Sequence, residues 1–104
     1  MEKRKHRRNR VHLDVDLVYP GGEKIRVKTR DLSIGGLFVE ATDIEPLKEG
    51  DPLTIIFLSI PPQGITYSIK AKVQRLTQNG IAVTFIDFGL EDLQFIDSIL
   101  SSLP

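Results

Sequence analysis

Cysteine and tryptophan are absent from this 104-residue sequence, and only two histidines are present. Without cysteine the chain has no disulfide framework and no thiolate chemistry, and two histidines argue against a structural zinc site. No apolar run approaches the roughly 20 residues of a membrane-spanning helix. The basic N-terminus has no apolar segment of the kind that a secretory signal requires. We therefore expect a cytoplasmic domain without a metal, a resident cofactor or a membrane segment.

The net charge of zero hides an uneven distribution. Residues 1–10 carry six basic side chains and one acidic, a net charge of +5, whereas the rest of the chain carries 8 basic and 13 acidic, a net charge of −5. A basic arm is typical of binding to an anion, such as nucleic acid, phospholipid or the phosphate of a nucleotide. The alternative is a solvated tail, and charge alone leaves both open. Because its cations repel one another and no apolar residue anchors it between Met1 and Val11, we expect a flexible arm over residues 1–10.

The body of the chain alternates apolar and polar residues at the period of a β-strand. The alternation is clearest at Val11, Leu13 and Val15, and Asn79-Gly80 is a strong hairpin signal. Strands are predicted at residues 11–18, 25–30, 37–41, 53–60, 66–76 and 81–86. Six short strands with regular turns favour a barrel or a sandwich, and closure into a barrel would leave no exposed edge.

The period changes near the C-terminus. Apolar residues recur at helical spacing over residues 90–103, as Leu93, Ile96, Leu100 and Leu103, flanked by Phe95 and Ile99. Gly89 is the candidate N-cap, and acidic residues follow it in the first turn, where the helix dipole favours them. The ordinary structural role of this amphipathic helix is to cover one end of the β structure, and the alternative is that it binds a partner.

Signals for catalysis are weak. His12 is predicted on the polar face of the first strand, and Ser33 has no nucleophile-elbow motif around it. No phosphate-binding glycine loop of either common type is present. We therefore expect a protein that is not an enzyme.

Two short motifs remain, one in the arm and one at the end of the second predicted strand. In the arm, Arg4 and Arg8 form R-x-x-x-R, and an arginine fork can bind phosphate oxygens or the O6/N7 edge of guanine. At residues 31–36 the sequence reads DLSIGG, a D-x-S-x-x-G motif. A carboxylate can accept from the N1–H and amino group of guanine, a hydroxyl can serve a phosphate, and a glycine permits close backbone approach or a positive φ. The structural alternative is that an Asx-turn and turn glycines explain the second motif.

Taken together, the motifs give a more specific signal than either alone. The R-x-x-x-R arm, a following hairpin and the D-x-S-x-x-G motif resemble the PilZ domain family, and residues 69–88 resemble the last hairpin of that family. The resemblance covers nearly the whole chain. It implies an all-β fold, a six-stranded antiparallel split barrel with a C-terminal α-helix, in one domain made of an arm (1–10) and a barrel with its helix (11–104).

The resemblance also implies a ligand, the bacterial second messenger cyclic diguanylate (c-di-GMP). The matching positions are Arg4, Arg8, Asp31, Ser33 and Gly36, with Lys3, Arg7 and Gly35 as additional candidates. In the family the two arginines hold guanine and phosphate, and the aspartate and serine contact the other guanine face and a phosphate. Because the arm is so basic, Arg7 or Arg10 could take the role of Arg4 or Arg8. Lys3 leaves open whether one nucleotide or an intercalated pair is bound.

The implied function is that of a small receptor. Ligand binding would order the arm and change the surface seen by a separate downstream protein, which the resemblance places in motility, biofilm or polysaccharide machinery. Met1 at the start favours a stand-alone protein. Two alternatives stay open: a PilZ-like adaptor that works without nucleotide, and a nucleic-acid-binding barrel. The second explains the basic arm but not the spacing of Asp31, Ser33 and Gly36. The chain also lacks the aromatic stacking surface that such a barrel would need, so no nucleic acid is expected.

Overall fold

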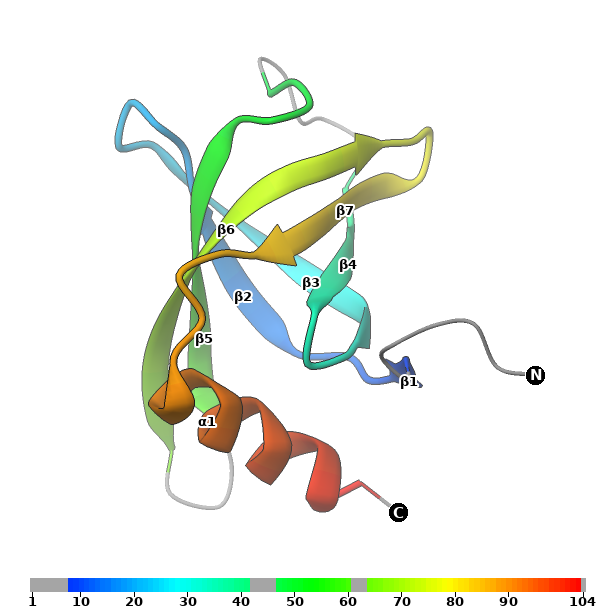
Figure 1. Cartoon of the computed structure of the whole chain (residues 1–104). Coiled ribbons are helices and arrows are strands. Elements are labelled where there is room, and N and C mark those ends of the chain that lie inside the picture. The colour runs from blue at the N-terminus through cyan, green and yellow to red at the C-terminus, as the bar shows by residue number, and fades with distance from the viewer. Residues whose placement is uncertain (1–7, 42–46, 61–63, 104) are drawn as a thin grey trace, which may run out of the picture.

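The computed structural model describes residues 8–41, 47–60 and 64–103, in seven strands and one helix (Figure 1). Most of the arm, including Lys3, Arg4 and Arg7, lies outside the described residues. The elements are β1 (Asn9–Arg10), β2 (Asp14–Val18), β3 (Lys24–Leu32), β4 (Gly36–Glu40), β5 (Pro52–Ile60), β6 (Ile65–Leu76), β7 (Gly80–Phe85) and α1 (Leu90–Ser101). Within these residues no helix is long and apolar enough to cross a membrane.

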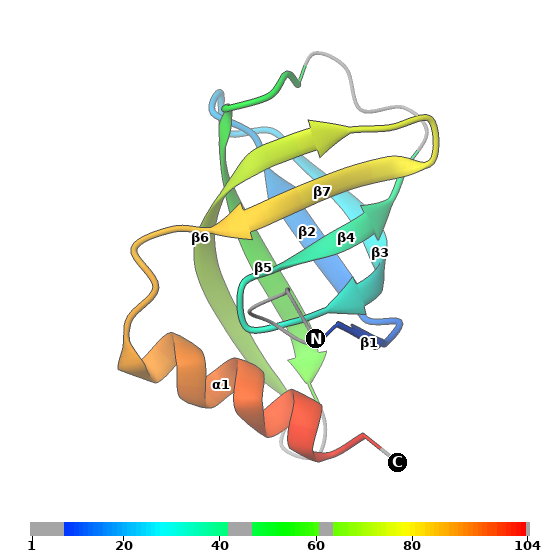
Figure 2. The ribbon, with the colours of Figure 1, turned by 45° about the vertical axis from the view of Figure 1, so that its right-hand side comes forward.

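Six of the strands close into an antiparallel barrel. They pair in the order β3, β2, β5, β6, β7, β4, and β4 then pairs with β3 to complete the ring (Figure 2). Alternate side chains of these strands fill the interior, where Val15, Leu17, Ile55, Phe57 and Ile81 are inaccessible to solvent. The prediction of a six-stranded antiparallel barrel is confirmed.

The first predicted strand, residues 11–18, is shorter in the structure. Regular pairing begins at Asp14, and Thr29 of β3 holds residues 11–13 instead. The buried Thr29 hydroxyl donates to the Val11 carbonyl (2.6 Å) and accepts from the Leu13 amide (2.8 Å). Backbone hydrogen bonds from the Thr29 amide to the Leu13 carbonyl (2.9 Å) and from the Val11 amide to the Arg30 carbonyl (3.1 Å) add to these contacts. Residues 11–13 therefore stay attached to β3 although they lie outside the regular strand.

β1 was not among the predicted strands. Its two residues, which the prediction assigned to the arm, pair with the end of β3, with Asn9 opposite Leu32 and Arg10 opposite Asp31. The base of the arm is therefore fixed against the barrel, beside the turn that carries the second motif.

α1 lies across one end of the barrel in both ribbon views (Figures 1 and 2). Phe95 packs edge-on against Phe57 of β5 (ring centroids 5.2 Å) and stacks on Tyr67 of β6 (4.3 Å). Gly89 is the N-cap as predicted, and the Asp92 carboxylate accepts from its backbone amide (2.9 Å). The helix end of the barrel is thus closed by an aromatic cluster.

The buried face of α1 differs from the predicted one. Ile96 and Ile99 are the buried residues of the helix, whereas Leu93 is 36% exposed. The helix also ends at Ser101, so Leu103 follows it rather than belonging to it. Because α1 packs on the barrel through Phe95, its buried face is rotated from the predicted one, and Leu93 lies at the edge of that face.

Candidate functional site

The D-x-S-x-x-G motif forms the turn between β3 and β4. The Ser33 amide donates to the Gly36 carbonyl (2.9 Å), which closes the turn. The Ser33 hydroxyl accepts from the Gly35 amide (3.1 Å) and donates to the Gly36 carbonyl (3.3 Å). Ser33 is only 5% exposed, and Leu32 before it is fully buried. The serine, and not the aspartate, is therefore the residue that builds the turn.

The Asp31 carboxylate forms ion pairs with arginines instead of accepting from the backbone of the turn. One oxygen accepts from Arg8 Nη1 (2.9 Å) and the other from Arg30 Nε (3.3 Å). The Asp31 side chain is 15% exposed, against 42% for Arg8. The structure thus brings together one residue of each predicted motif, because β1 lays the end of the arm beside β3.

Arg30 is a candidate that the sequence-based search did not include. The pairing of β3 with β4 shifts by one residue between Thr29 and Asp31, which makes Arg30 the extra residue of a β-bulge. Its guanidinium carbon lies 3.9 Å from the centre of the Phe38 ring, a cation–π contact. Its side chain is 39% exposed, so a positioned arginine fork faces solvent directly beside Asp31.

The glycines of the motif have a structural role of their own. A Cβ at Gly36 would overlap the Val83 carbonyl oxygen on the neighbouring strand β7. Neither Gly35 nor Gly36 has a positive φ, although that was one of the two predicted reasons for a glycine here. Close packing of β4 against β7 therefore accounts for Gly36 without reference to a ligand.

The charges around this turn suit an anionic, planar ligand. Arg8, Arg10 and Arg30 lie next to a single carboxylate, Asp31, so the local excess is positive. Arginine forks bind phosphate oxygens and guanine edges, and the two oxygens of the Asp31 carboxylate can accept from the N1–H and the amino group of guanine. Over the described residues, no group of three or more His, Cys, Asp or Glu side chains could hold a metal ion.

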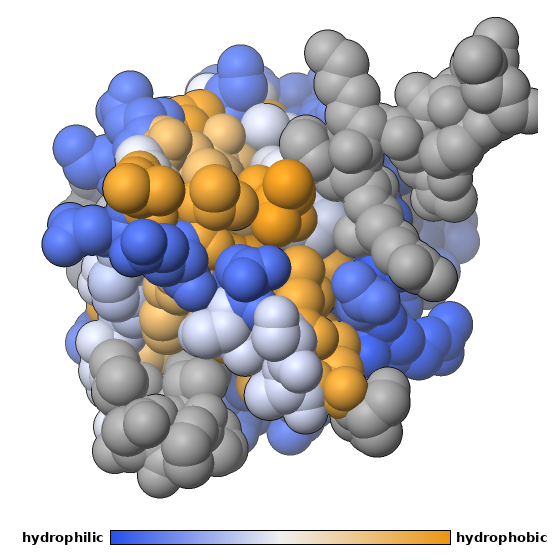
Figure 3. All heavy atoms as spheres, turned by 60° about the horizontal axis from the view of Figure 1, so that its bottom comes forward, coloured by the Kyte–Doolittle hydropathy of each residue, from blue (hydrophilic) through white to orange (hydrophobic). Residues whose placement is uncertain are grey.

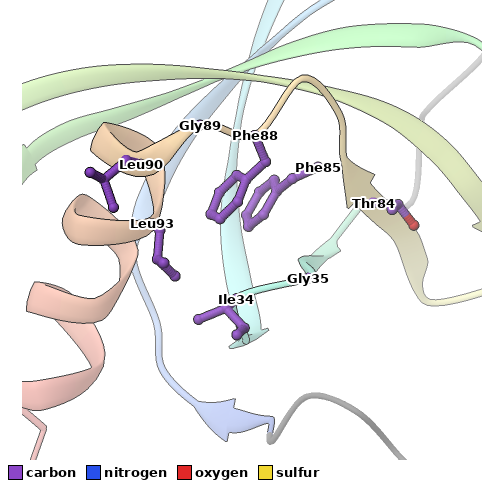
Figure 4. Close-up of a pocket in the computed structure, with 8 residues that line it drawn as sticks. All are labelled: Ile34, Gly35, Thr84, Phe85, Phe88, Gly89, Leu90 and Leu93. Carbon is purple, nitrogen blue, oxygen red and sulfur yellow. The ribbon is translucent and has the colours of Figure 1, made fainter.

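An apolar groove adjoins the same turn (Figure 4). Its volume is about 490 Å³, and it lies between the β3–β4 turn, the end of β7 and the start of α1. Its principal lining residues are Ile34, Gly35, Phe85, Phe88, Leu90 and Leu93. Figure 4 shows Phe85 and Phe88 side by side, with Leu93 and Ile34 pointing into the space next to them.

Comparison with known proteins places the chain in a family. The sequence profile of the PilZ domain matches residues 2–102. The chain belongs to the PilZ domain family. Among curated protein sequences no match was found.

Solved PilZ structures share this fold. The PilZ domain of CeSA from a cellulose-synthesizing bacterium is 18% identical, with a TM-score of 0.76 over 91% of this chain and 95% of that one. The PilZ domain of YcgR from Escherichia coli, solved with c-di-GMP, is 16% identical, with a TM-score of 0.80 over 98% of this chain and 92% of that one.

A third relative is longer than this chain. MrkH of K. pneumonia, solved as a complex with c-di-GMP, is 19% identical, with a TM-score of 0.77. The match covers 97% of this chain and 51% of MrkH, so the chain spans about half of the length of that relative.

Proposed function

We propose that this PilZ domain is a receptor for c-di-GMP that relays the signal to a separate protein and has no enzymatic activity of its own. The observation that carries the proposal is the contact between Arg8 of the arm motif and Asp31 of the turn motif, at 2.9 Å. Two motifs that are 23 residues apart in sequence contribute to one exposed, positively charged surface. YcgR and MrkH, which share the fold, were solved with this nucleotide.

The proposed contacts follow the chemistry of the groups. Asp31 accepts from the N1–H and amino group of one guanine, and Arg8 binds a guanine edge or a phosphate. Arg4 completes the arm contact, with Lys3 and Arg7 as additional candidates. Ser33 and Gly36 shape the turn that presents Asp31, because their polar groups bond one another within it. In this proposal Ser33 reaches the ligand only if its hydroxyl exchanges the bond to Gly36.

Arg30 adds a contact beyond the two motifs. Its guanidinium group lies over the Phe38 ring and its Nε donates to Asp31, so its two Nη groups are the donors that we assign to a ligand. A base whose N1–H edge faces Asp31 would present its O6 to a donor beside that carboxylate. We therefore assign Arg30 to the guanine contact.

Calorimetric titration tests the proposal. c-di-GMP is titrated into the wild-type chain and into Arg8→Ala, with GTP and a short DNA duplex as ligand controls. Arg26→Ala serves as a matched control, because Arg26 is also paired with an aspartate, Asp16 (3.0 Å), but on β2 and β3 away from the turn. We expect saturable binding of c-di-GMP alone, weakened by Arg8→Ala and retained by Arg26→Ala.

Two results would contradict the proposal. If c-di-GMP neither produces heat nor raises the melting temperature at millimolar concentration, the receptor function fails, and the adaptor alternative takes its place. If the DNA duplex binds instead, with an affinity that falls steeply as the salt concentration rises, the nucleic-acid alternative replaces the receptor function.

A further inference from the structure

The groove beside the β3–β4 turn presents hydrophobic side chains to solvent. Leu90 is 69% exposed and Leu93 36%, and these are the exposed large hydrophobic residues of the described chain. Phe85 and Phe88 stack in parallel at 5.2 Å and form one wall. Figure 3 shows hydrophobic side chains gathered on the end of the molecule that α1 covers. Contiguous exposed apolar surface of this kind marks a site of interaction.

The charge on the α1 side of the groove is negative. After Arg75 the sequence contains no lysine, arginine or histidine, and its acidic residues are Asp87, Glu91, Asp92 and Asp97. Asp92 is occupied by the Gly89 amide and the Tyr67 hydroxyl. The other three are exposed. Asp97 follows Leu90 and Leu93 at helical spacing, so it extends the same face of α1.

Glu91 and Asp97 belong to α1, which forms one wall of the groove, and Asp87 lies just before that helix. At the barrel end, Lys72 of β6 lies opposite Thr84, which also lines the groove. A ligand that fits must therefore be apolar at its centre and basic along α1. An anionic membrane surface or a nucleic acid would be repelled by the three carboxylates.

We propose that this groove binds a basic amphipathic helix of a partner protein. The apolar stripe of that helix would pack on Phe88, Leu90 and Leu93. Its lysines and arginines would pair with Asp87, Glu91 and Asp97. An apolar helix face in a hydrophobic groove is a common mode of peptide recognition, read through residues at i, i+3, i+4 and i+7.

The groove and the proposed nucleotide site share the β3–β4 turn. Gly35 lines the groove, its amide donates to Ser33 Oγ (3.1 Å), and its carbonyl accepts from the Phe85 amide (3.0 Å). A ligand that shifts Asp31 or Ser33 would thereby move a wall of the groove. This coupling rests on the proposed function, whereas the groove itself does not.

A designed peptide tests the groove. The probe is a fluorescein-labelled 18-residue helix of leucine and lysine with its leucines on one face, and the control peptide carries glutamate in place of lysine. Fluorescence anisotropy measures binding to the full wild-type chain without nucleotide. We expect the lysine peptide to bind about tenfold or more tightly than the glutamate peptide.

Two double variants locate the binding. Leu90→Ser with Leu93→Ser is expected to weaken binding of the lysine peptide at least tenfold, and Glu91→Gln with Asp97→Asn at least threefold. The matched control neutralises two exposed acids elsewhere, Asp14→Asn with Glu23→Gln, and is expected to leave the affinity within twofold. Melting temperatures establish that each variant is folded, which is expected because these side chains are exposed.

Several outcomes would overturn the inference. If the wild type binds the lysine and glutamate peptides with equal affinity, the acidic residues do not select a basic partner. If the leucine double variant binds the lysine peptide as tightly as the wild type does, the groove is not the binding site. If the wild type binds vesicles of phosphatidylcholine and phosphatidylglycerol and the leucine double variant does not, the groove binds a membrane surface and not a partner helix.

The coupling is measured separately by repeating the titration with saturating c-di-GMP. We expect the affinity for the lysine peptide to change at least threefold, and by thermodynamic reciprocity the peptide must change the affinity for nucleotide by the same factor. If nucleotide binds and the peptide affinity is unchanged, the coupling is wrong. If nucleotide does not bind at all, the proposed function fails together with the coupling, while the nucleotide-free titration still decides the groove.

Discussion

Arg30 is the residue at which a local irregularity has the largest consequence for the proposed site. As the extra residue of a β-bulge, it leaves the regular alternation of β3 and lies over Phe38. No pattern of apolar and polar residues marks such a position, because the bulge arises from the pairing of β3 with β4. The sequence-based search therefore found Asp31 and passed over the arginine directly before it.

Replacing Arg30 tests its assignment to the ligand. Arg30→Met keeps a side chain over Phe38 and removes the guanidinium donors. We expect c-di-GMP to bind roughly tenfold more weakly or worse, because one hydrogen bond to a charged group contributes about 1.5–3 kcal/mol and about 1.4 kcal/mol is a tenfold change in affinity. Calorimetry of wild type, Arg30→Met and the exposed control Arg75→Met measures the effect. An affinity within twofold of wild type in Arg30→Met would remove Arg30 from the site.

Gly36 separates structural from ligand-binding roles within the motif. Because a Cβ there would overlap the Val83 carbonyl oxygen, Gly36→Ala must push β4 away from β7. We expect its free energy of unfolding to fall by about 1–3 kcal/mol, the usual cost of overpacking. Urea denaturation measures it without nucleotide. Gly21→Ala is the control, since no atom lies within 4 Å of the added Cβ there, and a loss in both variants or in neither would refute the explanation.

At the scale of the elements, periodicity predicted most of the fold. Strands β2 to β7 and α1 lie where alternation and helical spacing put them, because buried strands and amphipathic helices need those periods. β1 was missed since two residues carry no period, and its pairing depends on β3. The buried face of α1 was misassigned at Leu93, because the rotation of the helix is set by Phe95 against Phe57 and Tyr67.

The docking of α1 has a pH-dependent component. The Tyr67 hydroxyl donates to Asp92 (2.8 Å), and this hydrogen bond, followed by desolvation, raises the pKa of Tyr67 to about 12 from 10.0. A raised pKa means that the stabilisation is fully present below pH 10 and is lost as the pH rises from 10 to 12. The phenolate would then face a carboxylate at the start of the helix.

Tyr67→Phe tests this contact. The variant is expected to be less stable by about 1 kcal/mol at neutral pH, the net contribution of one hydrogen bond. Its free energy of unfolding should fall less than that of the wild type between pH 10 and pH 12, so the two curves converge. Parallel curves over that range would show that Tyr67 does not link pH to the docking of α1.

At the scale of the whole molecule, the barrel brings two distant motifs and the helix to one region. The pairing of β1 with β3 sets Arg8 against Asp31, and the hydrogen bond between Gly35 and Phe85 joins that turn to the groove at α1. The fold that the resemblance to PilZ domains implied is confirmed, whereas the ligand-binding role of the residues it named stays a prediction. Their contacts with each other could not be predicted, because they depend on the register of β1.

A double-mutant cycle on c-di-GMP binding tests the central claim most directly. Calorimetry gives the affinity of the wild type, Arg8→Ala, Asp31→Ala and the double variant. We expect each single change to weaken binding roughly tenfold to a hundredfold, and the double change to weaken it by less than the product, because the two groups act on one ligand. Wild-type affinity in both single variants, or no binding by the wild type, would contradict the account.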